Sequence, residues 1–269
     1  MMNRRVPRLF LDSLPLVRQL ARQELIDRHK GSVLGTAWTI IGPLVTILVF
    51  VLVFSRIMGA RLEGFGAEIE QYTYSIYLIA GILPWMVFAK SLERITNLFV
   101  SQGHLITKVR LSLKALPLSV LLAEGVTHLI GMALFAIFLL MIGYPFSLWW
   151  LGLPLVYALQ SAFLYGLGLT LAILAVYLKD IREMVAVSLQ LWFWVTPIVY
   201  VTDILPPWVV DWLSLNPMFH VVGAYRDLIM RQQMPALAGL GGLLLATLAL
   251  VALAFWLLAR TERDLRDSF

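Results

Sequence analysis

Long apolar runs limit what this chain can fold into. Six such runs, separated by short polar segments, are each close to the length of about 20 residues that a helix needs to cross a bilayer. Of the 269 residues, 60% are apolar and only 14% are charged, and the mean hydropathy is +0.84. A soluble protein of this size cannot bury so much apolar surface. The runs lack strand-like alternation, so they predict membrane helices rather than a barrel.

The sequence therefore predicts an all-α membrane protein with six transmembrane helices in a single domain, residues 1–269. The spans are expected at residues 33–56, 74–98, 117–142, 149–177, 184–201 and 237–259. Residues 14–30 alternate leucines with charges at helical spacing, which predicts an amphipathic helix on the membrane surface. Residues 202–236 are rich in prolines, and we expect short re-entrant helices there, on the outer side.

Lysine and arginine predict the orientation. If both termini lie in the cytosol, 17 of the 21 basic residues face the cytosol and four face outward, as the positive-inside rule requires. The net charge of +5 would suggest nucleic acid in a soluble protein, but here it is explained by these loops, and no nucleic-acid partner is expected. The contacts of the spans are with membrane lipids.

No catalytic motif is recognisable. The sequence has no G-x-x-x-x-G-K-[ST] loop, no cysteine and no histidine cluster with metal-ligand spacing, so we expect neither a nucleotide site nor a metal or other cofactor in this chain. Glu124 and His128 lie one turn apart inside the third span, where polar groups are costly. We favour a helix-to-helix contact for this pair over a proton relay. Lys90, Glu93 and Arg94 are expected to anchor the cytosolic end of the second span, whose apolar run is interrupted by Gly81 and Pro84.

Aromatic residues gather toward the outer face. Trp149 and Trp150 fit the aromatic belt of a membrane interface. A second group fits a track on which sugar rings slide, because aromatic faces stack on the C–H faces of sugars. The candidate track consists of Trp192, Trp194, Tyr200, Tyr77, Trp85 and Phe88. The sequence alone leaves belt and track open for this group.

Short motifs along nearly the whole chain resemble those of ABC-2 type permeases that export polysaccharides such as O-antigen, capsule and teichoic acid. The opening motif runs from Arg28 to Gly35 and continues with Trp38 and Pro43. The further motifs, in order, are Leu78 to Trp85, Asn97 with Leu105 to Val109, Lys179 to Ile181, Pro197 to Tyr200, Leu215 to Met218, and Tyr225 to Asp227.

The resemblance implies the permease subunit of an exporter in the bacterial inner membrane. Two copies of this chain would pair around a channel for a lipid-linked polysaccharide, and two copies of a separate ATPase, holding ATP and Mg, would dock beneath them. Contacts with the ATPase are expected at Arg28, Lys30, Gln102, His104, Lys108 and Arg110. Gly35, Trp38, Gly42 and Pro43 would line the channel and let the first span pack closely and bend. The outer gate would contain Pro206, Pro207, Trp208, Trp212, Asn216 and Pro217.

Three alternatives remain open. An exporter of a smaller glycolipid or a drug would keep the fold and lose the long sugar track. A membrane-embedded glycan-modifying enzyme is disfavoured because no catalytic cluster is recognisable. A proton-coupled carrier is disfavoured because the two halves show no hydropathy repeat.

Overall fold

A computed structural model describes residues 6–28, 30–59, 67–103, 106 and 112–267. The described residues form helices joined by turns, which confirms the all-α class. The elements are α1 (Val6–Asp27), η1 (Gly35–Ala37), α2 (Trp38–Phe50), η2 (Val51–Ile57), α3 (Ala67–Glu70), α4 (Thr73–Ser101), α6 (Leu116–Met141), η3 (Leu148–Gly152), α7 (Leu153–Tyr177), α8 (Asp180–Val195), η4 (Thr202–Ile204), α9 (Pro207–Leu213), α10 (Pro217–Arg226), η5 (Asp227–Arg231) and α11 (Leu237–Asp267).

Five helical stretches are long and apolar enough to cross a membrane. They are Gly35–Ile57, Thr73–Ser101, Leu116–Met141, Leu148–Tyr177 and Leu237–Arg266, and they match five of the six predicted spans. The predicted fifth span, 184–201, is different. Its helix α8 has only 16 residues and ends at Val195, because Pro197 cannot continue a helix and keeps the residue before it extended. The count of six crossings therefore stays a prediction.

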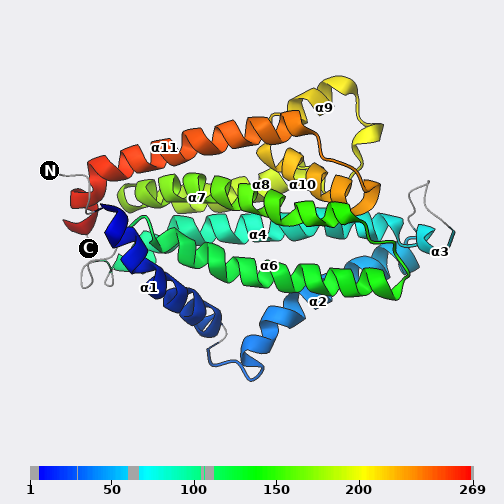
Figure 1. Ribbon diagram of the computed structural model, residues 1–269, viewed down its shortest axis with the longest axis horizontal. Coiled ribbons are helices and arrows are strands. Elements are labelled where there is room, and N and C mark those ends of the chain that lie inside the picture. Colours follow the sequence, from blue (N-terminus) through cyan, green and yellow to red (C-terminus); the bar gives the residue numbers. More distant parts are fainter. Residues whose placement is uncertain (1–5, 29, 60–66, 104–105, 107–111, 268–269) are drawn as a thin grey trace.

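Helix α4 is the centre of the bundle. It packs against α6, α7, α8 and α10, while α11 lies along α7 (Figure 1). In its most apolar stretch 83% of the residues are buried, against 11% in the first span. Gly81 and Pro84 do not interrupt it, since α4 is continuous through both. The Pro84 carbonyl accepts a 2.7 Å hydrogen bond from the buried amide of Gln160 on α7, which satisfies a polar group inside the bundle.

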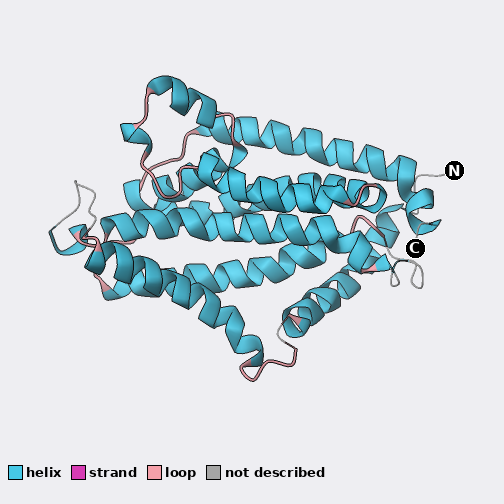
Figure 2. Cartoon of the chain, turned by 180° about the vertical axis from the view of Figure 1, so that it is seen from behind, coloured by secondary structure: helices cyan, strands magenta, loops and turns pink. Residues whose placement is uncertain are grey.

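Helices α1 and α2 lie on one side of the bundle, next to α6, and form a V whose vertex is the turn after α1 (Figures 1 and 2). The predicted interface helix 14–30 is shifted: α1 begins at Val6 and ends at Asp27. It packs on α6 and buries Val17 and Ala21. Helix α1 begins near the place where α11 ends (Figure 1), and we call this end of the bundle the terminal end and the opposite end, near α3, the far end.

The segment 202–236 consists of short helices, as its prolines predict. Helix α9 projects from the far half of the bundle (Figure 1), whereas α10 and η5 are packed into the core. Val222, Tyr225 and Ile229 are fully buried there, and the hydroxyl of Tyr144, in the loop after α6, donates to the Ile229 carbonyl over 3.1 Å. The re-entrant depth of this segment in a membrane stays a prediction.

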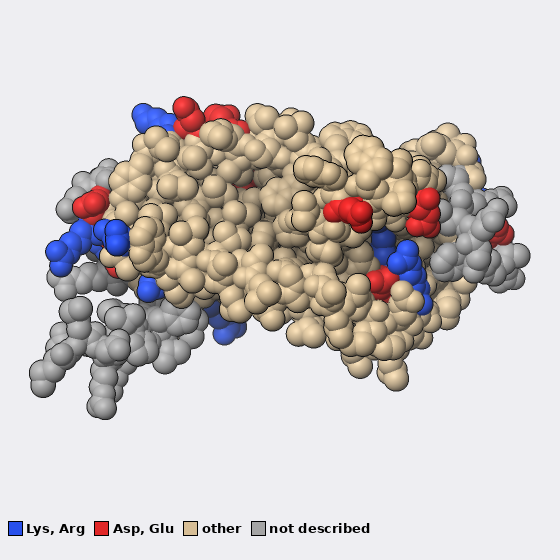
Figure 3. Space-filling view, turned by 90° about the horizontal axis from the view of Figure 1, so that it is seen from above, with Lys and Arg blue, Asp and Glu red and all other residues tan. Residues whose placement is uncertain are grey.

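Charged side chains gather toward the two ends of the molecule. On the face seen from above, a broad band without charges separates them (Figure 3). An uncharged band between charged ends is what a helix bundle in a bilayer requires, because charges in hydrocarbon are costly.

Candidate functional site

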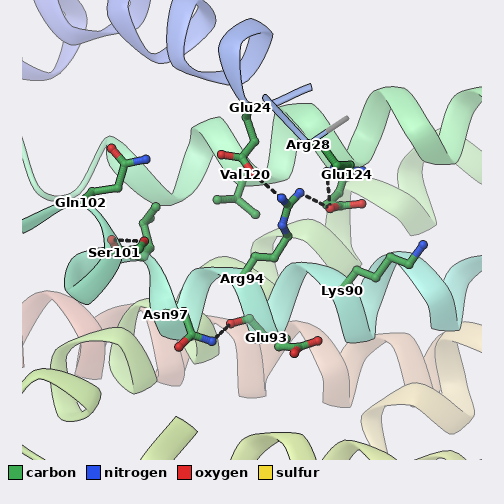
Figure 4. A pocket seen from close by; sticks show the side chains of 11 residues that line it. Glu24, Arg28, Lys90, Glu93, Arg94, Asn97, Ser101, Gln102, Val120 and Glu124 are labelled. Atoms are coloured by element: carbon green, nitrogen blue, oxygen red, sulfur yellow. Dashed lines mark hydrogen bonds and ion pairs between the residues drawn. The ribbon is translucent and has the colours of Figure 1, made fainter. Parts of the chain in front are cut away.

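Four charged side chains from three helical regions meet toward the terminal end. Arg94 of α4 reaches between two carboxylates: its Nη1 lies 2.9 Å from Glu124 Oε1 on α6, and its Nη2 pairs with Glu24 on α1 (Figure 4). Glu124 Oε1 is also 2.6 Å from Arg28 Nη2. We call Glu24, Arg28, Arg94 and Glu124 the charge network. It connects the interface helix with both the second and the third span.

The local fold explains this meeting. Arg28 follows the last turn of α1, where its backbone N–H bonds the Glu24 carbonyl over 3.1 Å, so both side chains lie on one face of the helix end. The Glu124 side chain is only 2% exposed. A carboxylate buried this deeply is tolerable only when it is paired, and here two guanidinium groups supply the charge. With two acids and two bases, the network is electrically balanced.

The charge network lies at one side of a pocket of about 590 Å³ between α1, α4 and α6 (Figure 4). The pocket is also lined by Lys90, Glu93, Asn97, Ser101 and Gln102. Lys90 and Glu93 are exposed, as expected for the end of a span, whereas Arg94 is half-buried in its ion pairs with Glu24 and Glu124. An anchoring role at the membrane interface stays a prediction for all three residues.

A second hollow, of about 530 Å³, lies between α4 and α8. Trp85, Phe193 and Trp194 line it together with Gln190 and with Lys90 and Glu93, which also line the charged pocket. The two hollows therefore share part of one face of α4, which we call the α4 groove. Along this face the lining changes from charged to aromatic, a combination that suits a hydrated ligand with apolar faces, such as a sugar chain.

The predicted aromatic track is only partly brought together. Trp85, Phe88 and Trp192 form one cluster, with ring centroids 5.5 Å apart for Trp85–Phe88 and 5.0 Å for Phe88–Trp192. Trp194 is 65% exposed, and its neighbour Phe193 lies 5.8 Å from Trp85. Phe88 is fully buried and Trp85 nearly so, so Trp194 is the most accessible ring of the group. Whether the rings face a channel stays a prediction.

Tyr77 and Tyr200 lie together, away from this cluster. The Tyr77 hydroxyl donates to the Tyr200 carbonyl over 2.8 Å, and the Tyr200 hydroxyl donates to the Trp194 carbonyl over 3.0 Å. Their hydrogen bonds hold the chain after α8, a structural role that the aromatic pattern did not reveal.

The described residues that were predicted to contact the ATPase differ in where their side chains lie. Arg28 points inward to Glu124, and Lys30 is 81% exposed, 3.7 Å from Asp27. Gln102 lines the charged pocket. His104, Lys108 and Arg110 lie outside the described residues. Contact with an ATPase stays a prediction for all six.

The predicted first-span residues show little close packing within the chain. No atom of another element lies within 4 Å of where a Cβ on Gly35 or Gly42 would stand, and Gly35 has a φ of +49° that favours glycine. Trp38 is exposed and donates to Ser32 Oγ over 2.9 Å. Pro43 is buried against α6, 3.5 Å from a Cβ built on Gly131. Gly131 on α6 is thus the small residue against which Pro43 of the first span packs.

The predicted outer-gate residues divide into two groups. Pro206 and Pro207 open α9, whose Trp208 and Trp212 are exposed. Asn216 instead joins buried elements: it caps α10, which Pro217 opens, accepts a 2.7 Å bond from Trp192 Nε1, and donates to Thr196 Oγ1 over 2.9 Å. A gating role stays a prediction for both groups.

Glu124 and His128 have separate partners. Glu124 belongs to the charge network, whereas His128 Nε2 is 2.9 Å from the Tyr225 hydroxyl and its ring stacks on Tyr157 at 4.8 Å. Both contacts join helices, as the favoured interpretation expected. An acidic residue such as Glu124 within an apolar helix indicates a basic partner elsewhere in the chain, but the sequence does not show which residue that partner is.

The comparisons with known proteins agree with this architecture. Residues 15–230 match the family model of the ABC-2 type transporter. The chain is 27% identical over 215 residues to the O-antigen export system permease protein RfbA of Klebsiella pneumoniae, covering 78% of both chains. It is 29% identical over 226 residues to the protein of the same name from Myxococcus xanthus, covering 82% of both. An all-helical chain with five membrane-length helices and this match is a membrane transport protein, and it belongs to the ABC-2 type transporter family.

Proposed function

We propose that this chain is the channel-forming permease subunit of an ATP-driven exporter that moves a lipid-linked polysaccharide across the bacterial inner membrane. The printed names of the relatives from Klebsiella pneumoniae and Myxococcus xanthus, both O-antigen export permeases, support this substrate class. The observation that carries the proposal in the structure is the α4 groove, where a charged pocket and an aromatic hollow share Lys90 and Glu93 of one helix.

The chemistry of the groove fits a glycan. Sugar hydroxyls need hydrogen-bonding partners such as Lys90, Glu93 and Gln190, and sugar C–H faces need exposed rings such as Trp194. Such contacts are individually weak and do not require one fixed sugar sequence. A long chain can therefore pass over them without being trapped.

The energy must come from a partner ATPase, because this sequence has no P-loop. We assign two ATPase copies and two permease copies to the exporter, with ATP and Mg on the ATPase. The charge network supports α1 as the element that receives the ATPase movement. Any displacement of α1 pulls on Arg94 and Glu124, and hence on α4 and α6 together.

The terminal end and the far end of the bundle are assigned to opposite sides of the membrane. Helix α1 begins at the terminal end and α11 ends there (Figure 1). We place this end in the cytosol. With both termini inside, the number of crossings is even, so we assign the sixth crossing to α8 together with the non-helical residues that follow it. The far end and α9 then face outward.

Deletion of the gene in the source bacterium tests the proposal. We expect the lipid-linked polysaccharide to accumulate inside the cell and to return to the surface when the wild-type chain is supplied. Normal surface polysaccharide in the deletion strain, together with loss of a smaller glycolipid or of drug efflux, would contradict the polysaccharide assignment and favour the smaller-substrate exporter.

A further inference from the structure

The chain after α8 is held by side chains rather than by a helix. Helix α8 ends at Val195, and the next residue, Thr196, is extended. The four carbonyls that follow, at residues 197–200, each accept a side-chain hydrogen bond. Arg226 Nη1 donates to Pro197 over 2.6 Å and Arg226 Nη2 to Ile198 over 2.9 Å. The Tyr74 hydroxyl donates to Val199, and the Tyr77 hydroxyl to Tyr200 over 2.8 Å.

We call this arrangement, with Arg226, Tyr74 and Tyr77 as its three donors, the carbonyl clamp. It joins three elements, because the tyrosines belong to α4, Arg226 ends α10, and the carbonyls continue from α8. Buried carbonyls require partners, and in a helix the backbone would supply them. Here the partners are side chains, and their hydrogen bonds can break without the unwinding of a helix.

Arg226 is the central donor, and its guanidinium makes contacts with carbonyls and with an aromatic ring. It is buried, its Nε donates to the Tyr77 carbonyl over 3.3 Å, and its guanidinium lies 3.4 Å from the centroid of the Tyr77 ring. Its bonding partners are carbonyls and its charge faces an aromatic ring, an arrangement that stabilises a cation through dipoles and π electrons. The neighbouring Tyr225 bonds His128, which ties the same helix to α6.

Gly81 provides the space for this guanidinium. A Cβ on Gly81 would stand 2.8 Å from Arg226 Nη2, closer than side-chain carbons approach such atoms. Two of the sequence motifs, Leu78 to Trp85 and Tyr225 to Asp227, thus meet at one contact. Beside the clamp lies a pocket of about 200 Å³ lined by Tyr77, Pro197 and Thr202, so the clamped chain has space on one side.

We propose that the carbonyl clamp is a latch that holds the far-end exit closed in the resting protein and is released during export. The inference rests on the proposed function and adds the residues that keep the exit shut. The donors are positioning residues, since they act through the chain at 197–200. An exit closed by a few exchangeable hydrogen bonds can open for a passing glycan and shut again behind it.

Cysteine labelling tests the latch, because the natural chain contains no cysteine. Ile198→Cys places one thiol on a side chain that is 1% exposed, next to the clamped carbonyls. In membrane vesicles without ATPase or glycan, a water-soluble maleimide should react slowly with this thiol. Added to this background, Tyr77→Phe should raise the labelling rate about fivefold, the equivalent of one lost hydrogen bond of about 1 kcal/mol, and Gly81→Ala should raise it at least as much.

Tyr144→Phe is the matched control. It removes another far-end tyrosine hydroxyl that bonds backbone carbonyls, Ile229 at 3.1 Å and Met230 at 3.3 Å, but lies outside the clamp. We expect it to leave the labelling of Ile198→Cys unchanged. Equal labelling in all variants, or an equal rise in the Tyr144→Phe control, would overturn the proposal.

A second measurement separates a latch from a static brace. In vesicles that hold the complete exporter, ATP and glycan should increase labelling of Ile198→Cys, whereas a brace would stay closed. Export without any change in labelling would refute the latch and leave the proposed function intact. If Tyr77→Phe raises the labelling rate of Ile198→Cys but the complete exporter never exports glycan with ATP, the proposed function would be refuted instead.

Discussion

Arg28 and Glu124 are 96 residues apart in the sequence and form an ion pair of 2.6 Å between the end of α1 and helix α6. Glu124 is the more buried partner, and Arg94 approaches the same oxygen to 2.9 Å. One carboxylate oxygen thus ties α1 to the bundle. This ion pair is the contact through which we propose that α1 acts on the spans.

Loss of this carboxylate should be costly. Glu124→Ala leaves Arg28 and Arg94 without their shared partner, and we expect a loss of about 3 kcal/mol in stability, the lower range for breaking a buried ion pair. Thermal unfolding of the purified protein in detergent measures it. Lys30→Ala serves as the control, because its exposed pair with Asp27 contributes at most about 1 kcal/mol. Similar effects of both substitutions would contradict the importance of the charge network.

Sequence patterns predicted most of the fold, because membrane helices are determined locally by the length of apolar runs. Five spans agree with the structure within a few residues, except that the helix of the last span continues to Asp267. The helix of the predicted fifth span ends at Val195 instead of residue 201, because an apolar run does not reveal where a helix stops. Residues 196–201 continue the apolar run, yet they are not helical, and side-chain hydrogen bonds from Arg226 and the tyrosines hold them.

The site was harder to predict for a different reason. Glu124 stands out as an acid within an apolar helix, but its partners Arg28 and Arg94 come from other elements. In the sequence, Arg94 shows no pattern that separates it from the neighbouring Lys90 and Glu93, which are exposed. Ion pairs between distant helices depend on how the bundle packs. The apolar periodicity of the sequence carries no information on this packing.

Close packing of α7 and α11 gives a second prediction. A Cβ on Gly166 would stand 2.8 Å from the backbone nitrogen of Val251, which cannot move without shifting α11. We expect Gly166→Ala to destabilise the protein by roughly 1–3 kcal/mol, the usual cost of overpacking. Gly241→Ala, on α11 with no neighbour within 4 Å, should be neutral or stabilising by up to about 1 kcal/mol. Thermal unfolding of the two variants side by side checks the difference.

The first span offers a way to restrain movement. Ser55 Oγ in the π-helical element η2 lies 2.7 Å from Ser75 Oγ on α4, and both residues are buried. In a chain without native cysteines, Ser55→Cys with Ser75→Cys should form a single disulfide. We propose that the first span moves against α4 during export, and we therefore expect oxidation to abolish export and a reductant to restore it. Undiminished export in the oxidised double variant would show that these helices move as one body.

Trp194 tests the aromatic hollow without disturbing the core. Since its side chain is 65% exposed, Trp194→Ala should leave stability within about 0.5 kcal/mol of wild type. We expect the export rate to fall about two- to tenfold, equivalent to about 0.5–1.4 kcal/mol for one stacked ring, and Trp194→Phe to retain most of it. Leu191→Ala, an exposed non-aromatic position on the same helix, should export normally. An unchanged export rate in Trp194→Ala would remove this ring from the track.

The most direct test of the permease assignment is transport by purified components. The chain is co-purified with the ATPase that binds it, both are placed in lipid vesicles, and a lipid-linked polysaccharide is followed across the bilayer with a glycan-cleaving enzyme on the opposite side. We predict that the glycan becomes accessible only when both proteins and hydrolysable ATP are present. Crossing that does not depend on ATP, or no crossing while the bound ATPase is active, would contradict the central claim that this chain is the permease of an ATP-driven polysaccharide exporter.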